Sequence, residues 1–412
     1  MICGVLVALD NAAFRKGFKV QRTARTLANS LVQAIVDEFR NAELPADRIV
    51  NLEQAFSFIR TSATLTSDKE FFVRLIGEID SHVNAFVRTH KYHDALGQFY
   101  VQFLRYANND KGLGIVLTPP HIAELFADLA EVNKDSVVYD NCCGTAGLLI
   151  ASMKKMLTDN GVNAATEKTI KNRRLIGVEF QDDIYALAVS NMVVHGDGKT
   201  NILSGDCFNL SPSIKDKFKP TVGLLNPPYK TKASTIEELD FVLNNLSALQ
   251  PGGKCVAILP FGCAIGDNGE IVERKQKLLA QHTLEAVMSM PVDLFHDSKV
   301  AVVTCVMVIT AGRPHPKGKK TWFGYWRDDG FVKTKHLGRI DDNHTWQDTK
   351  AKWLSAYRSR EVIDRFSLLA EVRPADEWCA EAYLKTDYSK LSKSDFVSEM
   401  KKYVAFRILN EN

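Results

Sequence analysis

The chain has 412 residues, of which 45% are hydrophobic and 25% are charged. This length predicts two or three folded units. The composition is that of a globular protein and excludes collagen-like, low-complexity and globally disordered chains. The net charge of +3 is too small to indicate a nucleic-acid partner by itself.

The N-terminal part begins with an apolar run over residues 2–9, which is too short to span a bilayer and lacks a basic leader. We therefore expect no signal peptide and no transmembrane segment. Such a run normally packs against preceding sequence, so we expect the chain to be a fragment of a longer protein. From Thr23 to Tyr106, apolar residues recur at helical spacing while Gly and Pro are scarce, and a breaker-rich stretch follows at 108–114. We predict an N-terminal helical domain over residues 1–110.

Beyond residue 110, short apolar runs alternate with helical patterns, which is typical of a parallel sheet covered by helices. We predict an α/β domain with a Rossmann-like, doubly wound sheet over residues 111–312. Its seven expected strands cover residues 136–139, 175–179, 200–204, 221–225, 254–259, 284–289 and 301–309. A Pro-Gly-Gly turn at residues 251–253 separates an amphipathic helix from the fifth strand.

The last part of the chain, residues 313–412, begins with a linker rich in Pro, Gly and Lys. Apolar and aromatic stretches at 322–326 and 330–334 flank Asp328-Asp329-Gly330, which predicts a β-hairpin. The remainder indicates helices and loops. We expect a small mixed C-terminal extension made of a basic aromatic hairpin plus helices.

This region also concentrates charge, because residues 311–360 hold twelve Lys or Arg against five Asp, and all five tryptophans lie beyond residue 320. Basic side chains interleaved with aromatic ones suit phosphate contact and base stacking. A solvated hairpin with a small aromatic core is an equal alternative.

The eight cysteines form no C-x-x-C pair and do not join paired histidines, so we expect reduced thiols in a cytoplasmic protein and no metal site. Cys142 and Cys143 are interpreted as a packed pair, since a vicinal disulfide would be strained. His195 is interpreted as the C-terminal residue of a helix, favoured there by the helix dipole.

A glycine-rich turn, Asp140 to Gly147, joins the first strand to the next helix. Such a turn lets a ligand approach the backbone beside the free N–H groups of a helix start. Glu179 ends the second strand, where a carboxylate can accept from two ribose hydroxyls, and Asp206 follows the third, where it can accept from an adenine amino group. Each feature alone is more often a turn or a helix cap, but together they favour a nucleoside cofactor.

The stretch Asn226-Pro227-Pro228-Tyr229 follows the fourth strand. Its two prolines remove two backbone donors and leave carbonyl groups facing the cleft. This acceptor floor suits a planar amine such as N6 of adenine, because the Asn226 side-chain oxygen and the Pro227 carbonyl would stabilise positive charge on the nitrogen. Tyr229 can stack on a base that has left its duplex. The alternative is a simple turn that closes a strand.

Residues 140–147 and Asn226 to Tyr229 together resemble motifs of the S-adenosylmethionine-dependent amino-methyltransferases of DNA. The stretch from Gly112 to about Thr310 looks like the modification subunit of Type I restriction-modification systems and related fused restriction-modification polypeptides. Thr118-Pro119 matches the Thr-Pro motif that precedes the glycine motif in this group, and the motif order is that of the adenine-N6 branch. This chain departs from the family pattern at Asn141, Cys142 and Ala146.

The resemblance implies a class I methyltransferase sheet of seven strands whose last pair is antiparallel, with S-adenosylmethionine as cofactor. The implied activity is site-specific methylation of adenine N6 in double-stranded DNA, with the adenine flipped out of the duplex. It implies cofactor contacts from Thr118, Pro119, Asp140, Gly144, Thr145, Gly147, Glu179 and Asp206, and catalytic roles for Asn226, Pro227, Pro228 and Tyr229.

The C-terminal region also resembles, over Trp322 to Asp341, a stretch that follows the methylase core in fused polypeptides. The C-terminal region as a whole is too short for a base-reading domain, so we expect a specificity subunit as a partner and a restriction subunit as a further partner. We expect no association with a membrane. Two alternatives stay open. One is methylation of RNA or of a protein glutamine, which Asn-Pro-Pro-Tyr also serves, and the other is a catalytically silent or truncated subunit that only binds DNA or a specificity partner.

Overall fold

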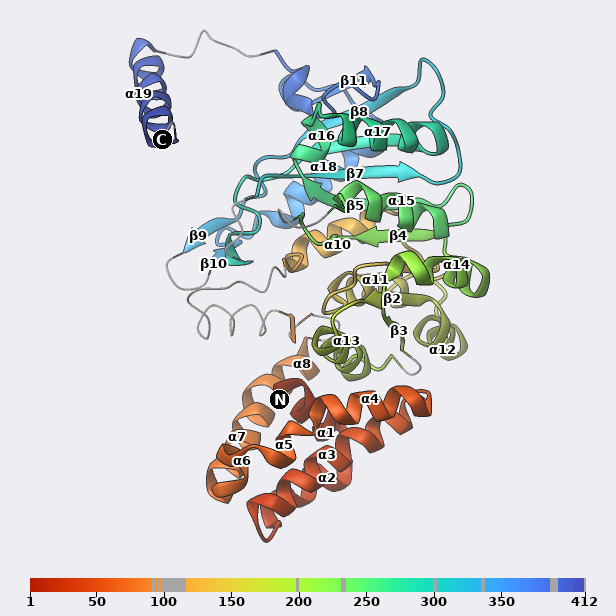
Figure 1. Cartoon of the computed structure of the whole chain (residues 1–412), viewed down its shortest axis with the longest axis vertical. Coiled ribbons are helices and arrows are strands. Elements are labelled where there is room, and N and C mark those ends of the chain that lie inside the picture. The colour runs from red at the N-terminus through yellow and green to blue at the C-terminus, as the bar shows by residue number, and fades with distance from the viewer. Residues whose placement is uncertain are drawn as a thin grey trace.

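The structure is a computed structural model of the chain, and it describes residues 1–90, 94, 96–97, 116–197, 200–230, 235–298, 302–334, 338–385 and 392–410. It has an N-terminal group of helices at one end and a sheet covered by helices in the middle (Figure 1).

The N-terminal region is helical up to residue 89, as the apolar spacing predicts. Leu27, Leu31, Ile35 and Phe39 all lie on the buried face of α3 (Ala24–Asn41). The apolar run at the start forms α1 (Ile2–Asp10), which packs against α3 and α13 (Asp182–Val194) and so joins this region to the sheet. The other helical segments are α2 (Ala12–Gly17), η1 (Phe18–Val20), α4 (Ala46–Phe56), α5 (Phe58–Thr61), α6 (Ala63–Ser67), α7 (Lys69–Glu78), η2 (Ile79–Asn84) and α8 (Ala85–Thr89). The predicted boundary near residue 110 lies outside the described residues.

A nine-stranded sheet in the order β11-β8-β6-β7-β5-β4-β1-β2-β3 forms the centre of the described structure. All seven predicted strands are present within three residues of their expected ends, and β7 runs antiparallel to both β5 and β6. The α/β prediction is therefore confirmed, while the strand count of seven is exceeded by β8 and β11. The strands are β1 (Val138–Asp140), β2 (Leu175–Glu179), β3 (Asn201–Ser204), β4 (Val222–Leu225), β5 (Lys254–Pro260), β6 (Thr283–Ser289), β7 (Thr304–Thr310), β8 (Lys320–Tyr325) and β11 (Ser367–Glu371).

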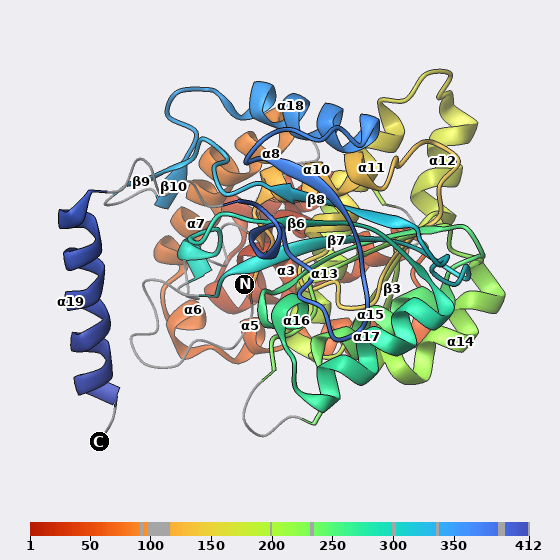
Figure 2. The ribbon, with the colours of Figure 1, turned by 90° about the horizontal axis from the view of Figure 1, so that it is seen from above.

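Helices cover both faces of the sheet because alternate strand residues are apolar on both sides. Val256 and Ile258 of β5 face one core cluster, and Cys255, Ala257 and Leu259 face the other. Figure 2 shows α10, α11, α12 and α18 on one side and α14, α15 and α17 on the opposite side. The covering helices are α10 (Pro120–Leu129), α11 (Gly147–Leu157), α12 (Ala164–Arg173), α14 (Cys207–Phe218), α15 (Glu238–Ala248), α16 (Gly262–Ile265), α17 (Gly269–Gln281) and α18 (Trp346–Ser359), with short 3-10 turns η3 (His296–Ser298) and η4 (Ala380–Ala382).

The predicted hairpin over residues 322–334 is wrong. Its first half, β8, pairs with β6 and β11 in the main sheet, whereas its second half, β9 (Val332–Thr334), pairs with β10 (Gly338–Ile340) in a separate two-stranded sheet. The main sheet therefore continues past the predicted boundary at residue 312.

All five tryptophans are buried, so they pack in the core and do not offer faces for base stacking.

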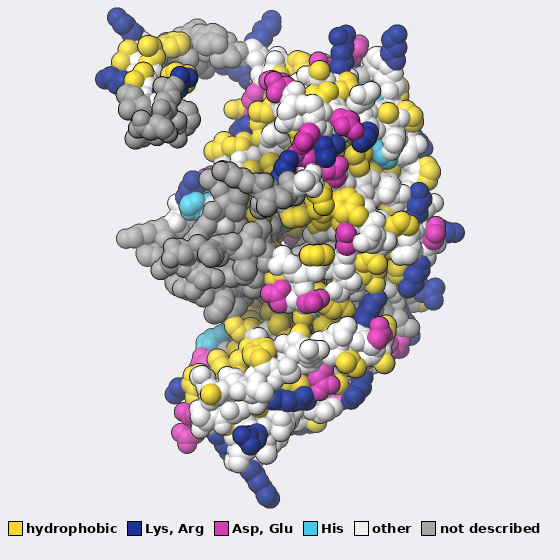
Figure 3. Space-filling view, viewed as in Figure 1, with side chains coloured by type: hydrophobic (Ala, Val, Ile, Leu, Met, Phe, Trp, Pro, Cys, Tyr) yellow, Lys and Arg dark blue, Asp and Glu magenta, His cyan; other side chains and the backbone are white. Residues whose placement is uncertain are grey.

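The last described helix, α19 (Lys393–Asn410), lies apart from the other elements in both ribbon views (Figures 1 and 2). Its exposed apolar residues recur at helical spacing, and the space-filling view shows them at its surface (Figure 3); they are Phe396, Val397, Met400, Tyr403 and Val404. Neither this helix nor any other in the described ranges is long and apolar enough to cross a membrane.

Candidate active site

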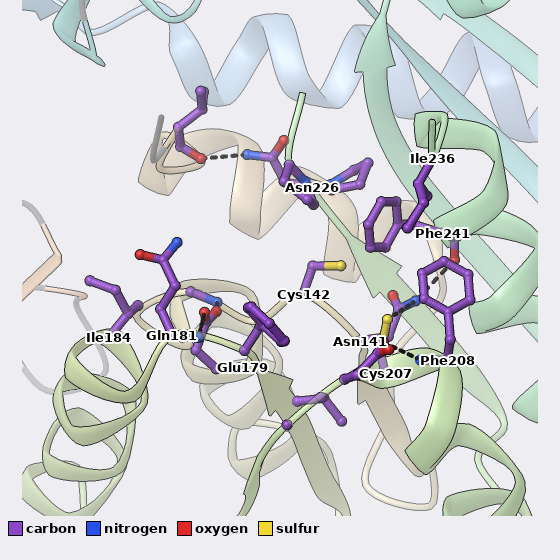
Figure 4. Close-up of a pocket in the computed structure, with 18 of the residues that line it drawn as sticks. Asn141, Cys142, Glu179, Gln181, Ile184, Cys207, Phe208, Asn226, Ile236 and Phe241 are labelled. Atoms are coloured by element: carbon purple, nitrogen blue, oxygen red, sulfur yellow. Dashed lines mark hydrogen bonds between the residues drawn. The ribbon is translucent and has the colours of Figure 1, made fainter. Parts of the chain in front are cut away.

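A cavity of about 410 Å³ opens at the carboxyl ends of β1, β2, β3 and β4, where open α/β sheets bind ligands. Of the residues expected to contact ligands, six line it: Gly144, Glu179, Asp206, Asn226, Pro227 and Pro228. The other six stand outside its lining: Thr118, Pro119, Asp140, Thr145, Gly147 and Tyr229. Figure 4 shows the glycine turn and the Asn226 floor on different sides of this cavity.

Glu179 holds the glycine turn against the second strand. Its Oε2 accepts from the Gly144 N–H over 3.0 Å, and its Oε1 accepts from the Gln181 N–H over 2.9 Å. Gly144 has a φ of 52°, a conformation that glycine adopts without steric cost. Burial raises the pKa of Glu179, against the effect of these hydrogen bonds. Each carboxylate oxygen keeps lone-pair capacity for a further donor.

Asp140 lies beneath the turn. It is 1% exposed, and its Oδ1 accepts from the Cys142 N–H over 3.0 Å. Burial, together with the nearby negative charge of Glu179, raises its pKa to about 8, although the hydrogen bond from Cys142 acts in the opposite direction. In this structure Asp140 supports the turn from behind.

Thr145 and Gly147 face away from the cavity, toward Asp94. The Thr145 hydroxyl donates to Asp94 Oδ2 over 3.0 Å, and Asn191 Nδ2 donates both to Asp94 Oδ1 and to the Thr145 carbonyl. A Cβ on Gly147 would lie 2.7 Å from Asp94 Oδ2, so the residue must be small for Asp94 to dock. The sequence analysis missed Asp94, which has no motif around it and lies far from the turn in the chain.

Asn141, one of the departures from the family pattern, is the centre of a buried amide network. Its Nδ2 donates to the Phe241 carbonyl over 2.9 Å and to Asn244 Oδ1 over 3.0 Å. Its Oδ1 accepts from Asn245 Nδ2, which also donates to the Tyr139 carbonyl. The departure therefore has a structural role, since it ties the glycine turn to α15.

Ala146, another departure, has a φ of 69° and is buried. A non-glycine residue there carries a conformational cost of about 1–2 kcal/mol. The two cysteines of the turn are free thiols; Cys142 is half-buried and lines the cavity, and Cys143 is buried. Within the described ranges, no group of His, Cys, Asp or Glu side chains is arranged to hold a metal ion.

Apolar side chains that the sequence analysis did not assign form the cavity walls. Phe180 directly follows Glu179, lines the cavity and is 74% exposed. Phe208 and Phe241 contact each other on the opposite wall, below Ile236 (Figure 4). Asp206 caps α14, with Oδ1 accepting from the Phe208 N–H and Oδ2 from Asn209. In the sequence, the position of Phe180 directly after the acidic residue that ends the second strand was the signal that could have identified it as a cavity residue.

Asn226 is held in one orientation by the segment before α10. Its Nδ2 donates to the Val116 carbonyl over 2.8 Å (Figure 4) and to Thr118 Oγ1 over 3.1 Å. Because a carbonyl can only accept, the amide nitrogen must face Val116 and the amide oxygen must face away from it. Asn226 Oδ1 is buried and has no hydrogen-bond partner in the part of the chain that the structure describes. The site thus presents an acceptor that lacks a donor.

The rest of the floor is built from Pro227, Pro228 and Tyr229. Tyr229 meets the ring of Phe295 edge to face, with centroids 6.1 Å apart. Its hydroxyl makes no hydrogen bond to any described residue, and burial raises its pKa. Packing therefore fixes the position of this ring. His195, as expected, directly follows the end of α13.

The sequence profile of the N-6 DNA Methylase family matches residues 91–411. The chain is 32% identical over 426 residues to the Type II restriction enzyme and methyltransferase RM.BcgI of Heyndrickxia coagulans, covering 99% of this chain and 65% of that protein. It is 25% identical over 277 residues to the Type I restriction enzyme EcoKI methylase subunit of Escherichia coli K12, covering 62% of this chain and 51% of that subunit. The chain thus spans between half and two thirds of these relatives.

The fold has solved counterparts. A chain of a type I R-M system, solved in a study of its assembly and conformational transition, superposes with a TM-score of 0.63 at 19% sequence identity, covering 97% of this chain and 86% of that chain. A likeness at this identity shows the fold, which is that of the class I methyltransferases expected above. The profile match covers most of the sequence, and the chain belongs to the N-6 DNA Methylase family.

Proposed function

We propose that this chain transfers a methyl group from S-adenosylmethionine to N6 of adenine in DNA, as the modification component of a restriction-modification system. The observation that carries this proposal is the buried, unpartnered Oδ1 of Asn226 beside two prolines that have no N–H. An acceptor left without a donor in a cavity is costly unless a ligand supplies one.

The cavity residues fit S-adenosylmethionine. The Glu179 oxygens keep capacity for two ribose hydroxyls, Phe180 offers an exposed ring for the adenine face, and Asp206 offers an acceptor for the adenine amine. The cofactor supplies an electrophilic methyl group on a sulfonium. Asp140, Thr145 and Gly147 would act indirectly, by holding the turn.

The floor residues act on the target amine. The two N–H bonds of the N6 amino group would donate, one to Asn226 Oδ1 and one to the Pro227 carbonyl. This pair of hydrogen bonds would draw the nitrogen lone pair out of conjugation with the adenine ring. The same two acceptors would stabilise the positive charge on nitrogen as the new N–C bond forms and the methyl–sulfur bond breaks, with its electron pair left on the sulfur as a neutral thioether. The surplus proton on nitrogen would then leave to water. Val116 and Thr118 keep Asn226 in its accepting orientation throughout.

The partners are proposed from the relatives, which include a methylase subunit of a Type I restriction enzyme. A specificity subunit would supply the base reading and a restriction subunit is a further candidate. The exposed apolar stripe on α19 supports a protein partner, because such a surface is normally buried. The reduced cysteines and the DNA substrate both favour the cytoplasm.

The test is transfer of labelled methyl from S-adenosylmethionine to unmethylated genomic DNA, with total RNA and a glutamine-containing release factor as competing acceptors. We expect label in DNA as N6-methyladenine. Asn226→Ala should lower transfer by at least a hundredfold while the affinity for S-adenosylmethionine stays within about threefold. Retained transfer in this variant would contradict the role of the floor, and label in RNA or protein would support the corresponding alternative.

Calorimetry with S-adenosylmethionine separates an enzyme from a silent subunit. Failure to bind the cofactor would refute the enzymatic proposal. Binding without transfer by the isolated chain, restored by coexpression with its genomic neighbours, would show that a partner completes the site.

A further inference from the structure

A buried cluster of charged and aromatic side chains lies between α10 and residues 328–334 and 338–340. Asp329, at 1% exposure, is its centre. Arg339 donates to both of its carboxylate oxygens, over 2.7 Å to Oδ1 and 3.0 Å to Oδ2. His121 Nε2 lies 3.2 Å from the same Oδ2, and the Phe331 N–H donates to Oδ1. The two oxygens are thus saturated with donors.

The ionisation states of this cluster follow from its contacts. Burial opposes ionisation of Asp329, but the hydrogen bonds from His121 and Arg339, with the charge of Arg339, outweigh it and lower the pKa to about 2. Burial lowers the pKa of His121, in opposition to the effect of Asp329. A neutral imidazole beside a carboxylate must carry its proton on the nitrogen that faces it, so His121 donates from Nε2.

One arm of the cluster leads to Asn226. The His121 ring is stacked on Phe331, with centroids 3.9 Å apart, and meets Trp346 edge to face. His121 is the second residue of α10, three positions after Thr118. Thr118 Oγ1 is one of the two groups that orient the Asn226 amide. The anchoring of His121 therefore fixes the segment that holds the catalytic amide.

The other arm leads to Tyr229. Arg339 Nε lies 3.3 Å from Asp293 Oδ1, and Lys333 Nζ lies 3.3 Å from Asp293 Oδ2. Asp293 stands two residues before Phe295, which is 1% exposed and packs against the Tyr229 ring. Since the Tyr229 hydroxyl makes no hydrogen bond to any described residue, packing positions this ring, and Phe295 is one of the side chains that supply that packing. The cluster thus reaches both ends of the acceptor floor.

We infer that His121, Asp329 and Arg339 are positioning residues for methyl transfer, which hold Asn226 and Tyr229 at a fixed separation across the floor. This inference rests on the proposed function. It also gives the C-terminal region a role in the chemistry, through strands β9 and β10, which lie in the basic aromatic region where phosphate contact and a solvated hairpin were equal expectations.

The test uses His121→Phe, which keeps the ring stack on Phe331 and removes only the hydrogen bond to Asp329. The control is Glu285→Gln in β6. Glu285 accepts from Thr310 and pairs with Lys319 over 2.7 Å. Its side chain is 18% exposed, against 9% for that of His121, and these contacts have no link to the floor. Both variants should lower Tm by about 2–4 °C. Only His121→Phe should lower kcat, by about tenfold or more, with KM for DNA and the affinity for S-adenosylmethionine within twofold.

Arg339→Lys keeps a cation beside Asp329 but cannot form the fork and reach Asp293 together, so the same kinetic pattern is expected. Amide hydrogen exchange supplies a readout that needs no methyl transfer. Exchange in peptides covering residues 116–118 and 225–230 should be faster in His121→Phe and Arg339→Lys and unchanged in Glu285→Gln.

Unchanged exchange at both peptides would overturn the inference, as would an equal loss of kcat in the control variant. A wild-type chain that binds no S-adenosylmethionine would instead refute the proposed function. The exchange measurement alone would then decide whether the cluster positions the floor.

Discussion

Replacing Glu179 by Gln tests the cofactor assignment most directly. The carboxylate accepts from Gly144 N–H and Gln181 N–H, one on each oxygen. An amide retains a single acceptor, so in either flip its NH₂ group faces one of these backbone donors. The loss of one charge-assisted hydrogen bond costs about 1.5–3 kcal/mol, and the unfolding free energy should fall by that amount.

The effect on ligand binding is separate, because the amide can also accept from only one ribose hydroxyl. A further loss of about 1.5–3 kcal/mol corresponds to a Kd for S-adenosylmethionine that rises about 10-fold to 150-fold. Calorimetric titration gives this Kd, and denaturant unfolding gives the stability. Glu285→Gln is the matched control, with reduced stability and an unchanged Kd. A Glu179→Gln variant that binds the cofactor like the wild type would refute the placement of the ribose at the end of β2.

Two further predictions concern buried residues outside the cavity lining. Because the folded-state pKa of Asp140 is raised to about 8 from an ordinary value of 3.8, its contribution to stability is full below about pH 4 and is lost as pH rises through 8. Unfolding free energies measured from pH 4 to 9 should therefore decline by an amount on the order of a few kcal/mol. Asp140→Asn should make this decline smaller. An equal dependence on pH in the wild type and the variant would contradict the raised pKa of Asp140. Trp353 is 2% exposed, and its ring is stacked on that of Trp326 with centroids 4.7 Å apart. Trp353→Ala should lower the unfolding free energy by about 3–5 kcal/mol and leave the salt dependence of DNA affinity unaltered. A variant that keeps its stability but binds DNA weakly would support base stacking instead.

The strand ends could be predicted from sequence because they depend on local rules. A buried strand followed by an acidic residue or a glycine turn marks the carboxyl edge of a parallel sheet, and β2 was predicted to the residue. Glu179, Asp206 and Asn226 all line one cavity for this reason. The prediction needed only the strand positions, since parallel topology brings their ends together.

The C-terminal strands could not be predicted in the same way, because their partners are distant in sequence. The turn at Asp328 to Gly330 is real, since Gly330 has a φ of 82° and its N–H donates to Asp328 Oδ1. The strand before it nevertheless pairs with β6 and β11. A local turn signal fixes the backbone bend at Gly330, whereas burial of Trp322 in one core cluster and of Phe323 in the other decides which strands are the neighbours.

The roles of Thr118 and Asn141 show a second limit of motif reading. Both belong to motifs expected at the cofactor, yet the structure commits their side chains to other protein groups, Thr118 to the Asn226 amide and Asn141 to α15. An amide serves as a hydrogen-bond acceptor for a substrate only if its nitrogen is occupied elsewhere, because a free amide could turn and present a donor. The Thr-Pro motif meets this requirement for Asn226 by binding its nitrogen. A residue in a sequence motif can therefore contact another motif of the protein instead of the ligand, and only the structure distinguishes these two possibilities.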